Sequence, residues 1–260
     1  MIPAHNEEER IGPMLDAYRA RCSDPEARFV VALDRCRDRT EEIVRGHREV
    51  DRRVEIVHYP KLGKGGVLME AFRRCDGDYV GFVDADCATP PSEFVRLAEI
   101  AAKADGADGA IAGRRHPAAI LPARRPLVRR IASAGFAFGI RRLFRLPYGD
   151  TQCGAKVLRR DVVEKALPLM SSRDFLFDVD LLIVARRLGY RIVEVPTIWI
   201  DQAGSRLRAR SDTLRMAASA LRLWLHHRVI PVDPAAADPV REDTLAPRDR
   251  TEEETDRVPS

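Results

Sequence analysis

Short apolar, β-branched runs alternate with amphipathic stretches along the first half of the chain. The apolar runs predict strands at 29–33, 54–57, 79–83 and 109–112. The amphipathic stretches predict helices near 7–20, 39–49, 65–75 and 92–104. This alternation indicates an α/β fold, in which a mostly parallel, Rossmann-like sheet carries helices on both faces.

The second half of the chain is less regular. Its pattern predicts a helix near 125–145, a strand near 154–158, a helix near 177–188, a strand near 191–195 and a last helix at about 212–228. From Pro231 onward the chain is rich in Pro, Asp, Glu, Arg and Thr, and it cannot bury enough apolar surface to order itself. We therefore expect one domain over residues 1–230 and a disordered acidic tail over residues 231–260.

The start of the chain is unusual for such a fold. A first strand is expected to supply about five residues, yet only Met1 and Ile2 precede Pro3. A central strand with so little body is an improbable arrangement. We therefore expect the natural chain to begin several residues upstream, which mass spectrometry of the native protein would test.

Charge is distributed unevenly along the chain. The 260 residues carry a formal net charge of +4, but residues 232–260 contain four arginines and nine acids, a net charge of −5, so the rest carries +9. A basic body suits phosphate-rich ligands or an anionic membrane surface. A soluble surface in an arginine-rich composition explains the bulk charge equally well.

Several classes of protein are disfavoured by the composition. There is no run of about 18 apolar residues, so no transmembrane helix is expected, and the N-terminus does not read as a secretory signal. The five cysteines are odd in number and form no Cys-x-x-Cys pair. This argues against a disulfide framework or a zinc site, and for a reducing cytoplasm.

Two carboxylates follow the apolar run 79–83, in the tripeptide Asp84-Ala85-Asp86. Ligands of open α/β sheets bind at the carboxyl ends of the strands, where both side chains are expected. Mg²⁺ and Mn²⁺ take one or two carboxylates together with phosphate oxygens. The tripeptide therefore predicts a divalent-metal site with Asp84 and Asp86 as ligands, although an isolated Asp-x-Asp is more often an acidic loop.

Other polar motifs follow the remaining predicted strands. Asn6 can cap the helix near 7–20, and the glutamates at 7–9 favour its positive N-terminus. Asp34 ends the strand at 29–33, where it can accept hydrogen bonds from a base or a ribose, and Asp38 or Thr40 can cap the next helix. The glycines and the lysine of residues 63–66 open a helix in a way that favours phosphate.

Taken in order, these motifs resemble those of the family 2 glycosyltransferases, which have the GT-A fold. The resemblance covers roughly residues 1–225. It rests on Pro3-Ala4-His5-Asn6-Glu7, Asp34, Gly63-Lys64-Gly65-Gly66 and Asp84-Ala85-Asp86 followed by Thr89-Pro90-Pro91. It implies that the donor nucleotide is bound by Pro3, Ala4, Asn6, Glu7, Asp34, Gly63, Lys64, Asp84, Ala85, Asp86 and Arg114.

Motifs in the second half narrow the resemblance to the polyprenyl (dolichyl) phosphate glucosyltransferases and mannosyltransferases. Asp150-Thr151-Gln152-Cys153-Gly154-Ala155-Lys156 is similar to the Asp-Thr-Gln-Cys-Gly-Phe-Lys of the glucosyl enzymes. The segments 177–182, 187–190, 194–196 and 204–206 follow in the same order. Ala155 departs from the usual aromatic residue, Cys87-Ala88 is an unusual continuation of the metal motif, and Arg114-Arg115 replaces a more common Ser-Arg.

The resemblance implies an inverting, metal-dependent transfer of a hexose from a nucleotide diphosphosugar to a polyprenyl phosphate. It tilts the donor towards UDP-glucose over GDP-mannose and implies Mg²⁺ or Mn²⁺, a peripheral place at the cytoplasmic face of the membrane, and no nucleic acid partner. The acceptor phosphate is already mostly dianionic at neutral pH, so orientation of two anions dominates catalysis over a strong base. The implied catalytic residues are Asp150, Gln152, Asp178 and Arg206, with Arg114, Arg115, Arg129 and Arg130 as further phosphate-binding candidates.

Contact with the membrane is expected from two segments. In the last helix, Leu214, Ala217, Ala218, Leu221, Trp224 and Leu225 share one face, which fits an interfacial helix or one packed on the protein's own core. The segment 127–147 could be two shorter helices around the acceptor.

Two alternative functions remain open. One is a transferase acting on a hydroxyl of a polysaccharide or glycolipid, which needs Asp178 or Asp150 as a base. The other is a non-catalytic nucleotide-binding module.

Overall fold

A computed structural model describes residues 1–104, 106–122, 127–200 and 209–228. Its elements are, in chain order, β1 (Ile2–Ala4), α1 (Ile11–Arg21), β2 (Phe29–Asp34), α2 (Thr40–Val50), β3 (Val54–Tyr59), α3 (Gly63–Phe72), β4 (Tyr79–Val83), α4 (Pro91–Lys103), β5 (Gly109–Gly113), α5 (Leu127–Phe144), β6 (Ala155–Arg159), α6 (Arg160–Ala166), η1 (Leu167–Leu169), α7 (Phe177–Arg187), β7 (Ile192–Pro196) and α8 (Ala209–His227).

The strands form two adjoining sheets of the order β1-β2-β3 and β4-β6-β5-β7. Within them only β6 runs antiparallel to its neighbours, so the expectation of a mostly parallel sheet is confirmed for the described strands. The first residue joins the two sheets: the amide of Val83 donates to the carbonyl of Met1 at 3.0 Å, and the nitrogen of Met1 donates to the carbonyl of Gly81 at 2.8 Å. Strand β1 therefore lies beside β4.

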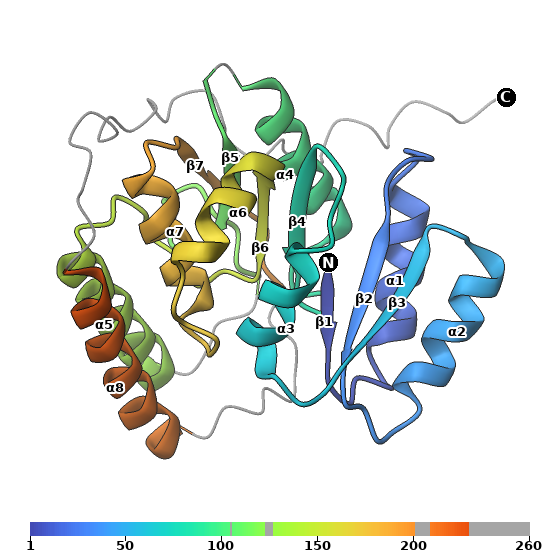
Figure 1. Ribbon diagram of the computed structural model, residues 1–260, viewed down its shortest axis with the longest axis horizontal. Helices are drawn as coiled ribbons and strands as arrows, with labels where there is room; N and C mark the ends of the chain where they lie inside the picture. Colours follow the sequence, from blue (N-terminus) through green and yellow to red (C-terminus); the bar gives the residue numbers. More distant parts are fainter. Residues whose placement is uncertain (105, 123–126, 201–208, 229–260) are drawn as a thin grey trace, which may run out of the picture.

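Helices cover both faces of the strands, as the alternating pattern predicts (Figure 1). α1, α2 and α4 pack on one face, and α3, α6 and α7 on the other, where the largest apolar core lies. α5 and α8 lie side by side outside α7, at the edge of the molecule farthest from α2 (Figure 1). This arrangement leaves the carboxyl ends of the parallel strands uncovered, which is where a ligand site is expected.

Several boundaries differ from the sequence-based expectations. The helix expected from residue 7 begins at Ile11, after a turn in which the carbonyl of Glu7 accepts the amides of Arg10 and Ile11. The segment 127–147 contains one helix, α5, where two shorter helices were considered. The short helix α6 was not expected at all. The disordered tail over residues 231–260 lies outside the described residues.

Candidate active site

Residues from four segments line a pocket of about 230 Å³ at the carboxyl ends of β1, β2 and β4. The lining residues are Pro3, Ala4, His5, Glu7, Arg10, Asp34, Lys64, Val67, Asp84, Ala85 and Asp86. Eight of the eleven residues predicted to bind the donor nucleotide are among them. Because strands β1, β2 and β4 are far apart in sequence, only the sheet brings these motifs to one place.

Asp84 is held from three sides at the end of β4. The ammonium nitrogen of Lys64 lies 2.5 Å from Oδ1 of its carboxylate. The amide of Asp84 donates to the carbonyl of Gly154 at 3.0 Å, and the side chain lies directly against the Cα of that glycine. Burial lowers the pKa of Lys64, but the charge of Asp84 outweighs it and holds that pKa above its usual value. Lys64 therefore carries its positive charge at neutral pH.

Asp86 lies on the loop after β4, and its Oδ1 accepts the amide of Ala88 at 3.0 Å. Burial raises the pKa of Asp86; the bond from Ala88 opposes this shift, and the negative charge of Asp84 adds to it. A carboxylate whose pKa is raised by burial and by a neighbouring negative charge favours a nearby cation.

A divalent cation fits this donor set. In the part of the chain that the structure describes, no three His, Cys, Asp or Glu side chains gather to hold a metal ion. Mg²⁺ typically binds through one or two carboxylates and completes its shell with water and phosphate oxygens. Lys64 already binds Asp84, so a metal ion has to compete with its ammonium group. The geometry therefore suits a cation that exchanges at Asp84 and Asp86.

Asp34 interacts with the backbone that opens α3. Its Oδ1 accepts the amide of Leu62 at 2.7 Å and its Oδ2 accepts the amide of Gly63 at 2.9 Å. The side chain is buried. In this structure Asp34 therefore caps the start of α3. The sequence had suggested that the same side chain accepts hydrogen bonds from a base or a ribose.

The expected role of Asn6 as the cap of α1 is wrong. Asn6 has a φ of 57°, and its Oδ1 accepts the amide of Arg37 at 2.8 Å, in the loop after β2. Glu7 forms an ion pair with Arg10, and its amide donates to the hydroxyl of Thr40 at 2.7 Å. The left-handed conformation of Asn6 prevents a helix from starting there. The side chain of Asn6 and the amide of Glu7 instead connect the loop after β1 with the loop after β2.

The start of α2 is capped by residues outside it. Oε2 of Glu8 accepts the amide of Arg39 at 3.0 Å, and Oδ1 of Asp38 accepts the amide and hydroxyl of Thr40 at 3.1 Å and 2.6 Å. Asp38 therefore binds the first amide of α2, as expected of a cap, and Glu8 binds the amide of the residue just before the helix.

The N-terminus of α3 packs on the loop before α7. The amide of Gly66 donates to the carbonyl of Arg173 at 2.9 Å, and a Cβ on Gly65 would lie 2.5 Å from the carbonyl oxygen of Asp174. Glycine is needed at 65 because of this close approach of two backbones. The glycines that the sequence assigned to phosphate binding therefore also serve to pack α3 against residues 173–174.

A buried ion pair connects Asp150 with Arg114 beyond β5. Nε and Nη2 of Arg114 donate to the two carboxylate oxygens at 2.5 Å and 2.9 Å, and the guanidinium lies 4.7 Å from the ring centre of Trp199. Burial would raise the pKa of Asp150, but the charge and hydrogen bonds of Arg114 outweigh it and lower that pKa. Oxygens of Glu194 accept the amides of Gly149 and Asp150 at 2.6 Å and 2.8 Å.

In this structure Nε and Nη2 of Arg114 are therefore bound to a protein carboxylate. Asp150, predicted to be catalytic, is only 2% exposed. Gln152, also predicted to be catalytic, donates from Nε2 to the carbonyl of Phe175 at 3.4 Å. The fourth predicted catalytic residue, Arg206, lies outside the described residues, as do the side chains of Arg129 and Arg130.

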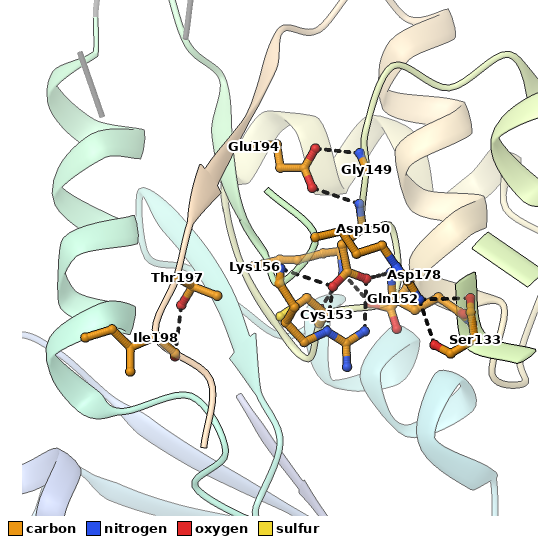
Figure 2. A network of polar contacts seen from close by, with 12 residues as sticks. Ser133, Gly149, Asp150, Gln152, Cys153, Lys156, Asp178, Glu194, Thr197 and Ile198 are labelled. Atoms are coloured by element: carbon orange, nitrogen blue, oxygen red, sulfur yellow. Dashed lines mark hydrogen bonds and ion pairs between the residues drawn. The ribbon is translucent and has the colours of Figure 1, made fainter. Parts of the chain in front are cut away.

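A second buried ion pair was missed from the sequence. Nζ of Lys156 donates to Oδ1 of Asp178 at 2.8 Å and to the carbonyl of Cys153 at 2.7 Å, and Lys156 has no exposed surface (Figure 2). The signal was a lysine inside the apolar strand 154–158, because a buried ammonium requires a partner of opposite charge. Lys156 and Lys64 both approach the ring of Phe82, at 5.3 Å and 5.6 Å from its centre.

Asp180 is a structural residue. Its Oδ1 pairs with Nε2 of His227 at 2.6 Å, and its Oδ2 accepts the amides of Ser171 and Ser172, each at 2.7 Å. Arg187 donates to Nδ1 of His227 at 3.0 Å, so the ring proton lies on Nε2. This network fixes the end of α8 to α7.

The fold is similar to that of the GT-A glycosyltransferases. Glucosyl-3-phosphoglycerate synthase from Mycobacterium tuberculosis, solved with Mn²⁺, UDP and phosphoglyceric acid, aligns with 88% of this chain and 78% of its own, at a TM-score of 0.64 and 20% identity. The family model "Glycosyl transferase family 2" matches residues 1–167. The chain belongs to this family of enzymes.

Curated relatives extend the similarity beyond residue 167. Dolichyl-phosphate beta-glucosyltransferase of Dictyostelium discoideum is 28% identical over 236 residues, covering 86% of this chain and 72% of the relative. The dolichyl-phosphate beta-glucosyltransferase of Drosophila melanogaster is 29% identical, covering 88% and 74%. Glycosyltransferase AglD of Haloferax volcanii is 28% identical, covering 89% of this chain but 37% of the relative.

Proposed function

We propose that this chain is an inverting, metal-dependent transferase that moves glucose from UDP-glucose to a polyprenyl phosphate at the inner face of the cell membrane. The choice of sugar and acceptor rests on the relatives named dolichyl-phosphate beta-glucosyltransferase, which are similar over most of this chain. The motif at residues 150–156, which resembles that of the glucosyl enzymes, supports the same choice.

The pocket supports the donor half of the proposal. Lys64, Asp84 and Asp86 combine a cation with two carboxylates at one sheet edge, as a nucleoside diphosphate bound with a divalent ion requires. Mg²⁺ or Mn²⁺ bound by Asp84 and Asp86 would neutralise charge on the diphosphate leaving group. The residues that line the pocket would hold and orient the diphosphate. Such orientation supplies much of the catalysis in reactions of this kind.

One observation favours a phosphate acceptor over a hydroxyl. Both candidate bases are already bound to cations: Asp150 to Arg114, and Asp178 to Lys156. Arg114 lowers the pKa of Asp150 and so makes this carboxylate a weak base, and Oδ1 of Asp178 already accepts a hydrogen bond from the ammonium of Lys156. A sugar hydroxyl needs such a base, whereas a phosphate monoester, with a second pKa near 6, is mostly a dianion at neutral pH. These ion pairs are the observation that carries the choice of acceptor.

The outer surface of α5 and α8 suits contact with a lipid bilayer. Phe138, Leu221 and Leu225 are 66%, 56% and 51% exposed. Exposed arginines accompany them: Arg141, Arg142, Arg145, Arg222 and Arg228. Apolar side chains combined with basic ones favour an anionic membrane surface. Within the described helices, none is long and apolar enough to cross a bilayer.

The apolar stripe predicted on the last helix is largely on its outer side. Ala217, Ala218, Leu221 and Leu225 are exposed, whereas Ala220, Leu223 and His227 face the core. On α5, Phe136 and Phe144 pack against the core, whereas Phe138 is exposed. The proposed membrane surface therefore consists of Phe138, Leu221, Leu225 and the neighbouring arginines.

The function is tested by incubating the purified protein with Mn²⁺ or Mg²⁺, polyprenyl phosphate and one radiolabelled nucleotide sugar at a time. The product is extracted into organic solvent and counted. We expect label from UDP-glucose to enter the lipid phase, and Asp86→Asn to abolish the transfer. Label from GDP-mannose alone would identify a mannosyltransferase, and absence of any labelled lipid would overturn the proposal.

A further inference from the structure

Asp84 and Gly154 face each other where β4 ends and β6 begins. The two strands pair antiparallel with Val83 opposite Ala155, so residues 84 and 154 form the next opposing pair. Directly opposed residues of an antiparallel pair normally hold their Cβ atoms about 4.5–5.5 Å apart. Here one of the two residues has no Cβ, and the side chain of the other lies across the vacant position.

A side chain at residue 154 would occupy the space of the Asp84 carboxylate. A Cβ built on Gly154 would overlap Oδ2 and Cγ of Asp84 and lie 3.1 Å from Oδ1. On its other side, Oδ1 meets Nζ of Lys64 at 2.5 Å. The carboxylate is thus confined between the Cα of Gly154 and the ammonium of Lys64.

The backbone at Gly154 has little freedom to move away from such a side chain. Its carbonyl accepts the amide of Asp84, and the preceding Cys153 is fully buried, with its carbonyl bound by Lys156 (Figure 2). Lys156 is fixed in turn by its ion pair with Asp178. Any atom added at residue 154 must therefore displace the carboxylate of Asp84 more than the backbone.

We propose that Gly154 is a positioning residue for Asp84: the missing side chain at residue 154 fixes the carboxylate in the orientation in which it meets a divalent cation. This inference assigns part of the segment 150–156 to the donor-metal site, whereas the family resemblance implied catalytic roles for Asp150 and Gln152 of that segment. Its metal-binding part rests on the proposed function.

The first test measures metal binding directly. Mn²⁺ is titrated into the protein in the presence of UDP, and free Mn²⁺ is followed by electron paramagnetic resonance. We expect Gly154→Ala to weaken Mn²⁺ binding by about 10- to 100-fold, the usual effect of disturbing a group that orients a metal ligand. The matched control is Gly46→Ala in α2, where a Cβ would meet nothing within 4 Å. Unchanged Mn²⁺ affinity in Gly154→Ala would overturn the proposal.

The second test needs no metal and separates this proposal from the proposed function. Thermal unfolding is compared for the wild type, Gly154→Ala, Asp84→Ala and the double variant, all in chelator. Because the added methyl group collides with the Asp84 side chain, it should lower the melting temperature strongly in the wild type and much less in Asp84→Ala. Equal losses in both backgrounds would contradict the inference.

The same comparison covers a failure to fold. If Gly154→Ala does not fold, the double variant with Asp84→Ala should restore folding, and a double variant that stays unfolded would overturn the proposal. If the wild type binds neither Mn²⁺ nor UDP, the proposed function fails, while the unfolding comparison still decides whether Gly154 positions Asp84.

Discussion

The ammonium of Lys64 lies 2.5 Å from the carboxylate of Asp84, so the chain's own cation occupies one of the two groups suited to a divalent metal. The pair connects the start of α3 with the end of β4 and lines the pocket at the sheet edge. A cation that binds Asp84 has to compete with Lys64, and a diphosphate that arrives with the cation gives Lys64 a new partner. Metal and nucleotide should therefore bind cooperatively.

Replacing Lys64 by methionine tests this competition. Lys64→Met should bind Mn²⁺ alone more tightly, by about tenfold or about 1.4 kcal/mol, because the competing charge is gone. The same variant should bind UDP with Mn²⁺ more weakly than the wild type, because the diphosphate loses its cation. Calorimetric titration of Mn²⁺ with and without UDP measures both effects.

The control for this experiment is Lys61→Met, at an exposed lysine just before the same helix. It changes the net charge equally but does not contact Asp84. If Lys61→Met and Lys64→Met had the same effect on both titrations, bulk charge would explain the result and the competition would be refuted.

The pair of Asp150 and Arg114 predicts a pH-dependent stability. Arg114 holds the pKa of Asp150 below that of an unfolded aspartate, near 3.9, so the stabilisation is present above about pH 4 and is lost as the pH falls further. Asp150→Asn should cost about 3 kcal/mol at pH 7, because it leaves Arg114 without its counter-charge. The loss should shrink towards pH 3.

Melting temperatures measured between pH 7 and pH 3 check this prediction. At pH 7 the variant should melt about 6–12 °C below the wild type, given the size of the domain. Asp16→Asn is the control, since this side chain is 69% exposed. A constant difference between Asp150→Asn and the wild type over the whole pH range would refute the linkage.

The pair of Lys156 and Asp178 distinguishes a structural acid from a catalytic base. Lys156→Met alone should destabilise the protein by about 3–5 kcal/mol, because it leaves a buried carboxylate unpaired. Lys156→Met combined with Asp178→Leu should recover most of that loss, since an apolar pair of similar volume removes both charges.

Activity of the recovered double variant then identifies the role of Asp178. With a phosphate acceptor, transfer should stay within about tenfold of the wild type, because no base is required. A general base contributes about 10²- to 10⁴-fold, so a loss of that size in a stably folded variant would point to a hydroxyl acceptor.

The exposed apolar side chains of α5 and α8 predict membrane association. The triple variant Phe138→Ser, Leu221→Ser and Leu225→Ser should lose cosedimentation with vesicles that contain anionic lipid, while its circular dichroism stays unchanged. Val50→Ser is the matched control, because Val50 is 77% exposed at the end of α2, away from this surface. Vesicle binding that survives in the triple variant would argue against these helices as the membrane contact.

Much of the donor pocket could be predicted from the sequence. Asp84 and Asp86 follow an apolar strand, and Lys64 opens a glycine-rich helix, so strand ends and helix starts already marked these positions. Their convergence follows from parallel topology, which carries the ends of neighbouring strands to one edge. Short-range patterns were sufficient here because each group depends mainly on its own element.

The sequence failed where a side chain serves a distant segment. Asn6 precedes a predicted helix and looked like its cap, yet it binds the backbone of Arg37. Arg114 was assigned to phosphate, and its pairing with Asp150 was not foreseen. In both cases the local pattern was compatible with more than one partner. The partner found in the structure lies more than 30 residues away in the sequence, so the local pattern could not identify it.

The sequence by itself determined the class of fold, the two carboxylates after β4 and the lysine that opens α3, because apolar periodicity and strand ends are local properties. Only the tertiary structure decided that Lys64 pairs with Asp84, that Lys156 pairs with Asp178, and that Gly154 leaves the space in which the Asp84 carboxylate lies. Partners 20 to 70 residues apart in the chain come close only when the strands have paired. A buried charge then requires an opposite charge beside it. Where two backbones approach closely, the space holds a single side chain.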